Sequence, residues 1–287
     1  MKIVIFGSNG MLGQAIYRYF CHQKDKVFGV ARNNADINID VTDDTKVISI
    51  INELKPDVVI NTIAIVNLDK CEEDHGLAYN INSRFVSILT EACKKINCYL
   101  IQISTDHYYI GDYKKKHSED DKIVLVNEYA RTKYAGEQYA LTHNLSLVVR
   151  TNIVGFRNSE GNKTFVEWIL SEFKTKNFIT AYSDFFTSSI DVYSFARILK
   201  DMMVKRATGV YNLSSSEVAS KLEFIRLMSK EFHSSIDIKE GSLNSHTGPI
   251  RANSLGLSTC KVEKLLGYKL PTQMEVVKSL KENYGGQ

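Results

Sequence analysis

The sequence has little proline, almost no surplus of charge and no long apolar segment. Its 287 residues include 3 prolines and 16 glycines, too few for a proline-rich linker or a low-complexity region. The 36 Lys and Arg nearly balance the 33 Asp and Glu, and the longest basic run is Lys114–Lys116. Because nucleic-acid-binding proteins concentrate basic residues on one surface, this balance argues against a nucleic-acid partner. The 44 % apolar content is that of a folded globular protein and excludes intrinsic disorder.

The sequence also offers no segment for a membrane and no cysteine framework. The apolar stretch Val58–Val66 is far shorter than the roughly 20 residues that cross a bilayer. The first residues lead straight into a short strand pattern and do not resemble a signal peptide. The five cysteines are an odd number without a C-x-x-C pair, which indicates reduced thiols. We therefore expect a cytoplasmic protein with no membrane partner, disulfide or bound metal.

Short apolar segments alternate with helical patterns through the first half of the chain. The expected strands are 2–6, 27–30, 37–39, 58–60, 100–103 and 145–149, and the longest expected helices are 78–96 and 128–141. This alternation predicts an α/β fold with a Rossmann-type, doubly wound parallel sheet. Beyond residue 150 the alternation loosens, which indicates a smaller α+β portion. We expect residues 1–153 to form an NADP-binding domain, with a segment near 178–205 returning to its sheet, and residues 154–287 to bind mainly substrate.

A glycine-rich turn separates the first strand from the first helix. Gly7, Gly10 and Gly13 have the spacing G-x-x-G-x-x-G. Glycines at such a turn let backbone N–H groups approach a pyrophosphate, and the helix N-terminus adds a partial positive charge. The turn therefore predicts a dinucleotide site. Its expected cofactor contacts are Gly7, Asn9, Gly10, Met11, Leu12 and Gly13.

The end of the second strand bears on the choice of cofactor. Arg32 lies nineteen residues beyond Gly13, where an acidic residue would bind the ribose of NAD and an arginine suits the 2′-phosphate of NADP. Arg32 therefore favours NADPH, although NADH stays open. Asp40 follows the third strand, and its position places it near the adenine.

A tyrosine and a lysine lie four residues apart in the expected helix 128–141. At this spacing Tyr129 and Lys133 share one helix face. A neighbouring ammonium favours the phenolate form and brings the tyrosine pKa toward the neutral range. Thr105, at the end of the strand 100–103, supplies a hydroxyl that can hold a carbonyl oxygen. Thr105, Tyr129 and Lys133 are the expected catalytic residues.

Together these motifs resemble the extended short-chain dehydrogenases/reductases, and more narrowly the dTDP-4-dehydrorhamnose reductase family. Further stretches that fit are 55–61, 68–72, 103–106, 131–137 and 266–271. The resemblance implies that Thr105 and Tyr129 bind a 4-keto oxygen, that Tyr129 donates the proton, and that Lys133 also holds the nicotinamide ribose. It further implies that Thr62, Ile63 and Ala64 lie along the cofactor and that Asn82 supports the site.

The departures from the family concern the substrate. Asn152-Ile153 stands where rhamnose-forming members have Ser-Trp, and His107 begins an altered stretch after Asp106. The expected substrate-binding residues are Thr105, Asp106, His107, Asn152, Phe165 and Arg251. His107 either contacts substrate or is a satisfied polar residue, and Arg251 either clamps a diphosphate or is solvated.

The resemblance implies an NADPH-dependent reductase acting on the C4 keto group of a nucleotide-diphospho-4-keto-6-deoxyhexose in deoxysugar biosynthesis. A UDP-linked 2-acetamido-2,6-dideoxy-hexos-4-ulose is a good candidate substrate. One alternative is a non-catalytic NADP-binding regulatory subunit similar to methionine adenosyltransferase β. Another is a nucleotide-sugar epimerase or dehydratase with tightly held NAD, against which Arg32 counts. Helices equivalent to 78–96 and 128–141 often pair between subunits in this superfamily, which makes a homodimer the default assembly.

Overall fold

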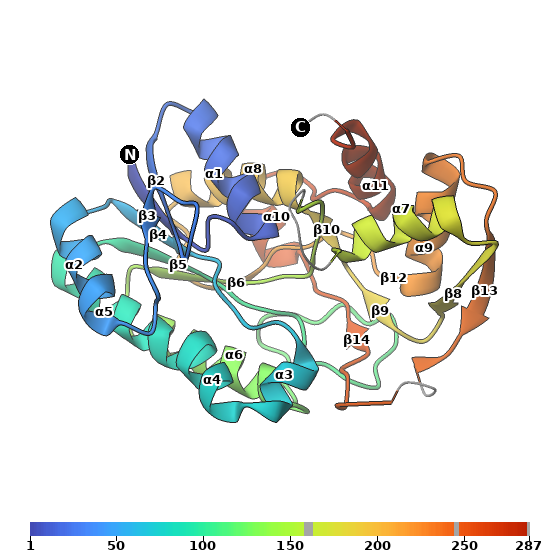
Figure 1. Ribbon diagram of the computed structural model, residues 1–287, viewed down its shortest axis with the longest axis horizontal. Helices are drawn as coiled ribbons and strands as arrows, with labels where there is room; N and C mark the ends of the chain where they lie inside the picture. Colours follow the sequence, from blue (N-terminus) through green and yellow to red (C-terminus); the bar gives the residue numbers. More distant parts are fainter. Residues whose placement is uncertain (158–162, 244–246, 286–287) are drawn as a thin grey trace. The chain divides into compact units, whose positions relative to one another are not determined.

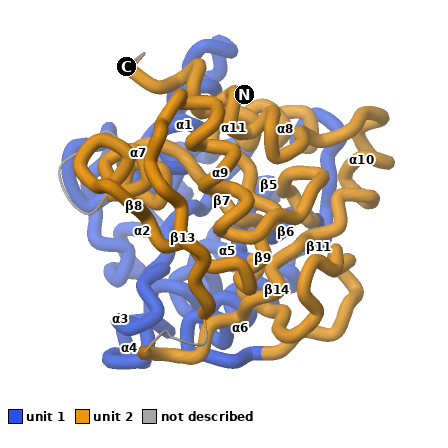
Figure 2. The backbone as a smooth tube through the Cα atoms, turned by 90° about the vertical axis from the view of Figure 1, so that its right-hand side faces the viewer, with its two compact units in different colours: residues 1–105, 125–150, 203–211 blue, residues 106–124, 151–202, 212–287 orange. Residues whose placement is uncertain are grey.

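The computed structural model describes residues 1–157, 163–243 and 247–285, and the chain divides into two compact units (Figure 2). Unit 1 comprises residues 1–105, 125–150 and 203–211, and unit 2 comprises residues 106–124, 151–202 and 212–287. The sequence analysis expected a boundary at residue 153 and one returning segment near 178–205, and the structure describes two interleaved units with a returning segment at 203–211. The segment 106–124, from the N-terminal half of the sequence, belongs to unit 2. The segment 203–211, from the C-terminal half, belongs to unit 1.

Unit 1 is built on a seven-stranded sheet. Its strands are β1 (Lys2–Phe6), β2 (Lys26–Ala31), β3 (Ile37–Asn38), β4 (Val58–Asn61), β5 (Tyr99–Ile103), β6 (Ser146–Arg150) and β11 (Gly209–Asn212). They lie in the order β11-β6-β5-β4-β1-β2-β3, and the pairings from β3 through β6 are parallel. The expected Rossmann-type α/β fold is therefore confirmed. The strand order reverses between β1 and β4, and ligands of such sheets bind beside that point at the carboxyl ends of the strands.

The strand that returns to this sheet is β11, which lies just beyond the segment near 178–205 that the sequence analysis expected to return. The strand β8 (Phe178–Tyr182) instead pairs in parallel with β13 (Asp237–Gly241) inside unit 2. Along β8 exposed and buried residues alternate, whereas every residue of β4, β5 and β6 is buried. A strand with one wet face suits a small two-stranded sheet, because the central strands of a doubly wound sheet are covered on both faces.

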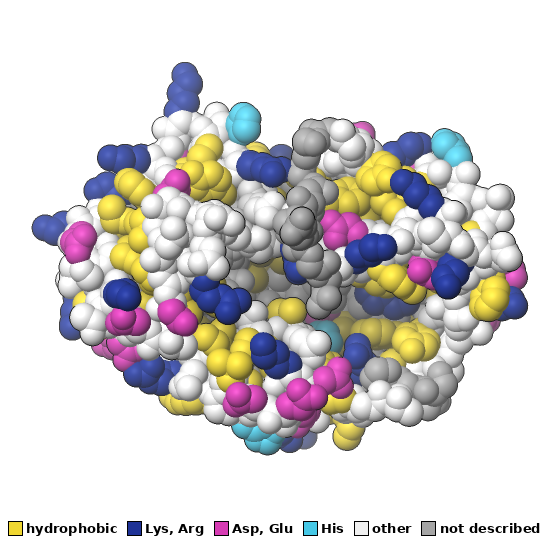
Figure 3. All heavy atoms as spheres, viewed as in Figure 1, with side chains coloured by type: hydrophobic (Ala, Val, Ile, Leu, Met, Phe, Trp, Pro, Cys, Tyr) yellow, Lys and Arg dark blue, Asp and Glu magenta, His cyan; other side chains and the backbone are white. Residues whose placement is uncertain are grey.

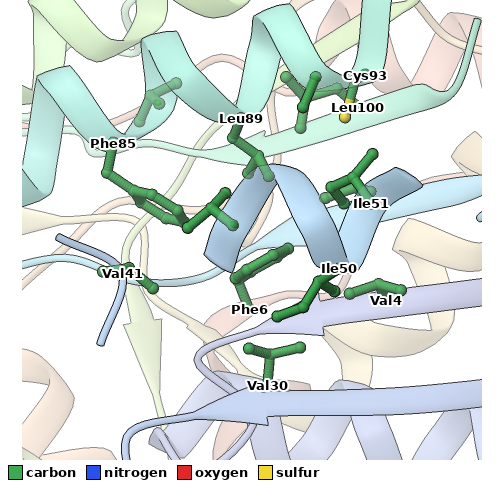
Figure 4. Packing of buried hydrophobic residues seen from close by; sticks show 14 of the residues in the cluster. Val4, Phe6, Val30, Val41, Ile50, Ile51, Phe85, Leu89, Cys93 and Leu100 are labelled. Carbon is green, nitrogen blue, oxygen red and sulfur yellow. The ribbon is translucent and has the colours of Figure 1, made fainter. Parts of the chain in front are cut away.

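Helices cover both faces of the large sheet (Figure 1). The unit 1 helices are α1 (Met11–His22), α2 (Asp44–Leu54), α3 (Leu68–Glu73), α4 (His75–Tyr79), α5 (Phe85–Ile96) and α6 (Glu128–Leu141). Figure 4 shows Val4 and Phe6 of β1 packed against Ile51 of α2 and Phe85 and Leu89 of α5. Alternation along β1 directs Val4 and Phe6 to one face and the intervening residue to the other. The helix α1 lies on that other face.

The expected helix 78–96 is interrupted by a π-helical turn, Asn80–Arg84, between α4 and α5. Asn82 in this turn accepts a hydrogen bond from the Ile65 N–H (2.8 Å) and donates to the Ile65 carbonyl (3.1 Å) and to Thr132 Oγ1 (3.2 Å). A Cβ on Gly136 of α6 would lie 2.3 Å from the Asn82 carbonyl oxygen. The turn and α6 therefore pack backbone against backbone, and Asn82 fixes the helix that carries Tyr129. Such π turns are frequent near functional sites.

Unit 2 has short strands and longer helices. The strands besides β8 and β13 are β7 (Ile153–Val154), β9 (Phe186–Thr187), β10 (Ile190–Asp191), β12 (Ala219–Ser220) and β14 (Ser254–Leu255), and the helices are α7 (Phe165–Thr175), α8 (Val192–Val204), α9 (Lys221–Glu231), α10 (Cys260–Leu266) and α11 (Gln273–Glu282). The strands form three small sheets, β10-β7, β12-β9-β14 and β13-β8. Capping boxes at Thr164, Ser220 and Thr272 begin α7, α9 and α11, which fixes these helix starts locally.

The surface carries both signs of charge. On the face seen in Figure 3, Lys and Arg side chains are scattered among Asp, Glu and hydrophobic side chains. In the part of the chain that the structure describes, no helix has the length and apolar composition to span a bilayer.

Candidate active site

The glycine turn after β1 is closed by contacts that leave no room for side chains. Gly7 has φ +87°, and a Cβ there would lie 2.5 Å from Thr62 Oγ1. A Cβ on Gly13 would lie 2.0 Å from the Gly7 carbonyl oxygen. The Gly7 N–H donates to the Val30 carbonyl (2.8 Å), and the Gly10 N–H donates to the Gly7 carbonyl (2.9 Å). Glycine is thus required at Gly7 by the positive φ and at Gly13 by close helix–strand packing.

The start of α1 fits a bound pyrophosphate. Gly10 is the N-cap residue and provides no side-chain cap, and the first turn holds no acidic residue, so the first amides of α1 remain available to an anion. Ser8 in the turn is only 6 % exposed, and its hydroxyl has no hydrogen-bond partner among the described residues. A cavity of 320 Å³ adjoins the turn and is lined in part by Ser8, Asn9 and Gln14. These features support a dinucleotide phosphate at Asn9, Gly10, Met11 and Leu12.

Beyond β2 the chain presents a cation and two carboxylates. Arg32 is exposed directly after β2. Hydrogen bonds from Thr42 hold the pKa of Asp40 below its usual value, and the charge of Arg32 contributes to the same shift. Asp36, which the sequence analysis missed, accepts a hydrogen bond from the Gly29 N–H (2.7 Å). Arg32 is the first charged residue after β2, and both Arg32 and Asp36 are exposed.

Residues 62–64 follow β4 at the point where the strand order reverses. Thr62 Oγ1 donates to the Phe6 carbonyl (2.8 Å), and the Ile63 N–H donates to Asn61 Oδ1 (3.0 Å). These bonds fix the backbone of Thr62, Ile63 and Ala64 beside the carboxyl ends of β1 and β4. The family resemblance assigned this segment to the cofactor, and the fold positions it where a cofactor of such a sheet binds.

Tyr129, Lys133 and Glu137 repeat at four-residue spacing along α6 and share one face. All three are buried, with Tyr129 7 % and Lys133 4 % exposed. Lys133 Nζ donates a hydrogen bond of 2.7 Å to the carbonyl oxygen of Ile103, the last residue of β5. Burial lowers the pKa of Lys133 to about 8, although the negative charge of Glu137 opposes the shift. The lysine therefore stays mainly protonated at pH 7 and joins α6 to the strand end that carries Thr105.

A buried ion pair, which the sequence analysis missed, lies behind Lys133. Glu137 is fully buried and accepts hydrogen bonds from Ser104 Oγ (2.6 Å), Arg150 Nη2 (2.8 Å) and Arg150 Nε (3.1 and 3.2 Å). Its signal in the sequence was the continued spacing of four after Tyr129 and Lys133. Ser104 immediately precedes Thr105, which is 3 % exposed. The network therefore holds the end of β5, and with it the backbone of Thr105, against α6.

In unit 2 the expected substrate residues Asp106 and Asn152 are bonded to each other. Asp106 is 1 % exposed and accepts a hydrogen bond from Asn152 Nδ2 (2.8 Å). Asn152 Oδ1 in turn accepts from Ser189 Oγ (2.8 Å). Both the amide nitrogen and the amide oxygen of Asn152 are therefore hydrogen-bonded within the protein, and Asn152 orients Asp106.

Two cationic side chains of unit 2, Lys221 and Arg251, act on His107. Burial lowers the pKa of His107 to about 4, and the charges of Lys221 and Arg251 add to the shift. His107 is therefore a neutral imidazole at pH 7 and unsuited to act as a cationic proton donor. The ring of Phe165 lies 4.4 Å from Lys221 Nζ, measured to the ring centroid. The sequence analysis named His107, Phe165 and Arg251 but missed Lys221.

Comparison with known proteins identifies the family of the chain. Residues 1–285 match the family described as the RmlD substrate binding domain. The chain belongs to this family. A dTDP-4-dehydrorhamnose reductase of Aggregatibacter actinomycetemcomitans is 26 % identical to this RmlD-family chain over 230 residues, which cover 78 % of the chain and 76 % of that protein.

Solved structures extend the similarity over the whole RmlD-family fold. The crystal structure of a dTDP-4-dehydrorhamnose reductase ortholog from Clostridium acetobutylicum has a TM-score of 0.87 and 26 % identity, covering 98 % of each chain. The crystal structure of a dTDP-4-dehydrorhamnose reductase from Bacillus anthracis in complex with NADP has a TM-score of 0.90 and 22 % identity, covering 98 % of this chain and 99 % of that one.

Proposed function

We propose that the protein is an NADPH-dependent reductase of the C4 keto group of a nucleotide-diphospho-4-keto-6-deoxyhexose. The observation that carries this proposal is the position of Lys133. Its buried ammonium lies on the helix face of Tyr129 and is bonded to the strand end that leads into Thr105. A tyrosine and an ammonium on one helix face, with the ammonium bonded to the strand end that precedes a threonine hydroxyl, supply the donor types that reduction of a ketone requires.

The binding roles of the chain follow from the contacts of unit 1. The amides at the start of α1 would hold the pyrophosphate of NADPH, Arg32 would bind its 2′-phosphate, and Thr62, Ile63 and Ala64 would flank the rest of the cofactor. NADPH supplies the hydride that reduces the carbonyl carbon. The dinucleotide named in the Bacillus anthracis structure is NADP, in agreement with the cationic Arg32.

The residues proposed to transfer and stabilise the proton lie on α6 and directly after β5. Thr105 would donate a hydrogen bond to the C4 carbonyl oxygen, and Tyr129 would donate the proton that converts this oxygen to a hydroxyl. With a pKa of about 8, Lys133 is protonated at pH 7, and its charge stabilises the phenolate that remains on Tyr129. The Glu137–Arg150 pair keeps this face of α6 in register with β5.

Two observations bear on the substrate: the activity for which relatives are named, and the residues at which this chain differs from them. Relatives are named dTDP-4-dehydrorhamnose reductases, yet Asn152 and Ile153 replace the Ser-Trp of rhamnose-forming members, and Asn152 is bonded to Asp106. We therefore propose a sugar that differs from dTDP-4-dehydrorhamnose, with a UDP-linked 2-acetamido-2,6-dideoxy-hexos-4-ulose as the first candidate. We further propose that the enzyme works in the cytoplasm. We also propose that it is a homodimer, and light scattering of the purified protein tests this assembly directly.

The proposal is tested by loss of NADPH absorbance with freshly generated dTDP- and UDP-linked 4-keto-6-deoxy sugars, with and without a 2-acetamido group. We expect turnover with at least one sugar and a new hydroxyl at C4, identified by NMR of the product. Tight NADPH binding without turnover on any sugar would refute the reductase and favour a regulatory subunit similar to methionine adenosyltransferase β. Oxidised NAD retained through purification would instead indicate an epimerase or dehydratase.

A further inference from the structure

The ammonium of Lys221 lies over two aromatic rings of unit 2. Lys221 Nζ is 4.4 Å from the ring centroid of Phe165 and 5.4 Å from that of Phe185. Lys221 is also the first residue of α9, after the N-cap Ser220. The positive end of the helix dipole disfavours a cation at this position. A residue that violates a local preference in this way is expected mainly where function requires it.

Lys221 lacks a partner for its three N–H donors. Among the described residues, its ammonium forms no hydrogen bond and no ion pair within 4.0 Å, and the aromatic rings are its only contacts of that kind. Burial lowers the pKa of Lys221 to about 8, although the charge of Asp106 opposes the shift. The group is therefore still mainly a cation at pH 7. Lys221 as a whole residue is half-buried.

The charged groups that act on Lys221 and His107 are two cations, Lys221 and Arg251, and one carboxylate, Asp106. Asp106, the carboxylate whose charge Lys221 senses, is already bonded to Asn152. The charges of Lys221 and Arg251 both act on His107, which burial keeps neutral. A ligand that brings anionic oxygens would gain charge-assisted hydrogen bonds from Lys221 and lose none that the protein already makes.

The chain itself links this group to the proposed reaction. Asp106 and His107 directly follow Thr105, and consecutive Cα atoms are about 3.8 Å apart. Asp106, whose charge acts on Lys221, and His107, on which the charge of Lys221 acts, are therefore one and two residues along the backbone from the threonine assigned to the carbonyl oxygen.

We propose that Lys221 is a substrate-binding residue that donates hydrogen bonds to anionic oxygens of the nucleotide sugar. This inference rests on the proposed function only in taking a nucleotide sugar as the ligand. The oxygens belong either to the diphosphate or to a carboxylate on the sugar, and Phe165 and Phe185 keep the ammonium in place before the ligand arrives.

The test is a calorimetric titration of the full chain with uridine, UDP, dTDP and UDP-glucuronate. The variants are Lys221→Met, which keeps the length and removes the charge, Lys221→Arg, which keeps the charge, and Lys230→Met as a control on an exposed lysine of the same helix. We expect Lys221→Met to weaken nucleoside diphosphate binding about 10- to 100-fold, as for loss of a hydrogen bond to a charged group. Lys221→Arg should recover most of the affinity, and Lys230→Met should match the wild type.

The ligands separate the two sources of the anion. Weakened UDP binding assigns Lys221 to the diphosphate, whereas weakened binding of UDP-glucuronate alone assigns it to a sugar carboxylate. Equal affinities of wild type and Lys221→Met for every anion would overturn the proposal, as would failure of the wild type to bind any of them. A thermal melt establishes that each variant is folded. Because these titrations involve no turnover, failure of keto-sugar reduction would refute the proposed function and leave this inference standing.

Discussion

Burial of Lys133 should lower the free energy of unfolding at neutral pH. The substitution Lys133→Met measures this loss because it removes the buried charge. Unfolding returns the lysine pKa from about 8 to its ordinary value near 10.4. Between these values the unfolded chain binds more protons than the native one, so stability rises with pH across this window. The lowered pKa reduces the free energy of unfolding by about 3 kcal/mol at pH 7 and by about 1 kcal/mol at pH 10. The hydrogen bond to the Ile103 carbonyl offsets roughly 1 kcal/mol of this cost.

We therefore expect Lys133→Met to raise the free energy of unfolding by about 2 kcal/mol at pH 7. Near pH 10 this gain should disappear. The measurement is urea unfolding of the cofactor-free protein at both pH values, with Lys95→Met as a control on an exposed lysine of α5. The variant should at the same time lose reductase activity. An effect of Lys133→Met that does not change between pH 7 and pH 10 would refute the proposed protonation of this group.

Three further substitutions test other parts of the account. Arg32→Glu should weaken NADPH binding about 10- to 100-fold and leave NADH binding nearly unchanged, because only NADPH carries the 2′-phosphate; fluorescence titration measures both. Glu137→Gln should cost 3–5 kcal/mol (an order-of-magnitude range) in urea unfolding because it leaves Arg150 buried without its counter-charge, and adding Arg150→Met should recover part of the loss. Gly13→Ala should abolish dinucleotide binding, since its methyl group meets the Gly7 carbonyl; binding at wild-type strength would contradict the close packing of the turn.

The sequence predicts unit 1 well because its signals are local. Each buried strand of the sheet is a short apolar segment, and Gly7 and Gly13 occupy positions where backbone geometry allows no side chain. The spacing of Tyr129 and Lys133 likewise reports a shared helix face without any knowledge of the rest of the fold. Each of these features follows from the local geometry of a strand, helix or turn and can therefore be recognised from the sequence.

Unit 2 could not be predicted to the same depth, since its arrangement depends on contacts between distant segments. The pairing of β8 with β13 joins segments some sixty residues apart, and no local pattern marks that partnership. Lys221 has no motif at all. It becomes noticeable only when Phe165, Phe185 and Asp106 are known to surround it. The Glu137–Arg150 pair was missed for the same reason, although Glu137 follows the spacing of its neighbours on α6.

The central claim is that Tyr129 donates the proton in reduction of a nucleotide-bound keto sugar. The most direct measurement compares NADPH oxidation by the wild type and by Tyr129→Phe with the best keto-sugar substrate, together with the NADPH affinity of each. We predict that kcat falls about 10²- to 10⁴-fold in the variant. The NADPH dissociation constant should change little, because the substitution removes one hydroxyl from a side chain that α6 still positions. A variant that keeps the wild-type rate would contradict the account.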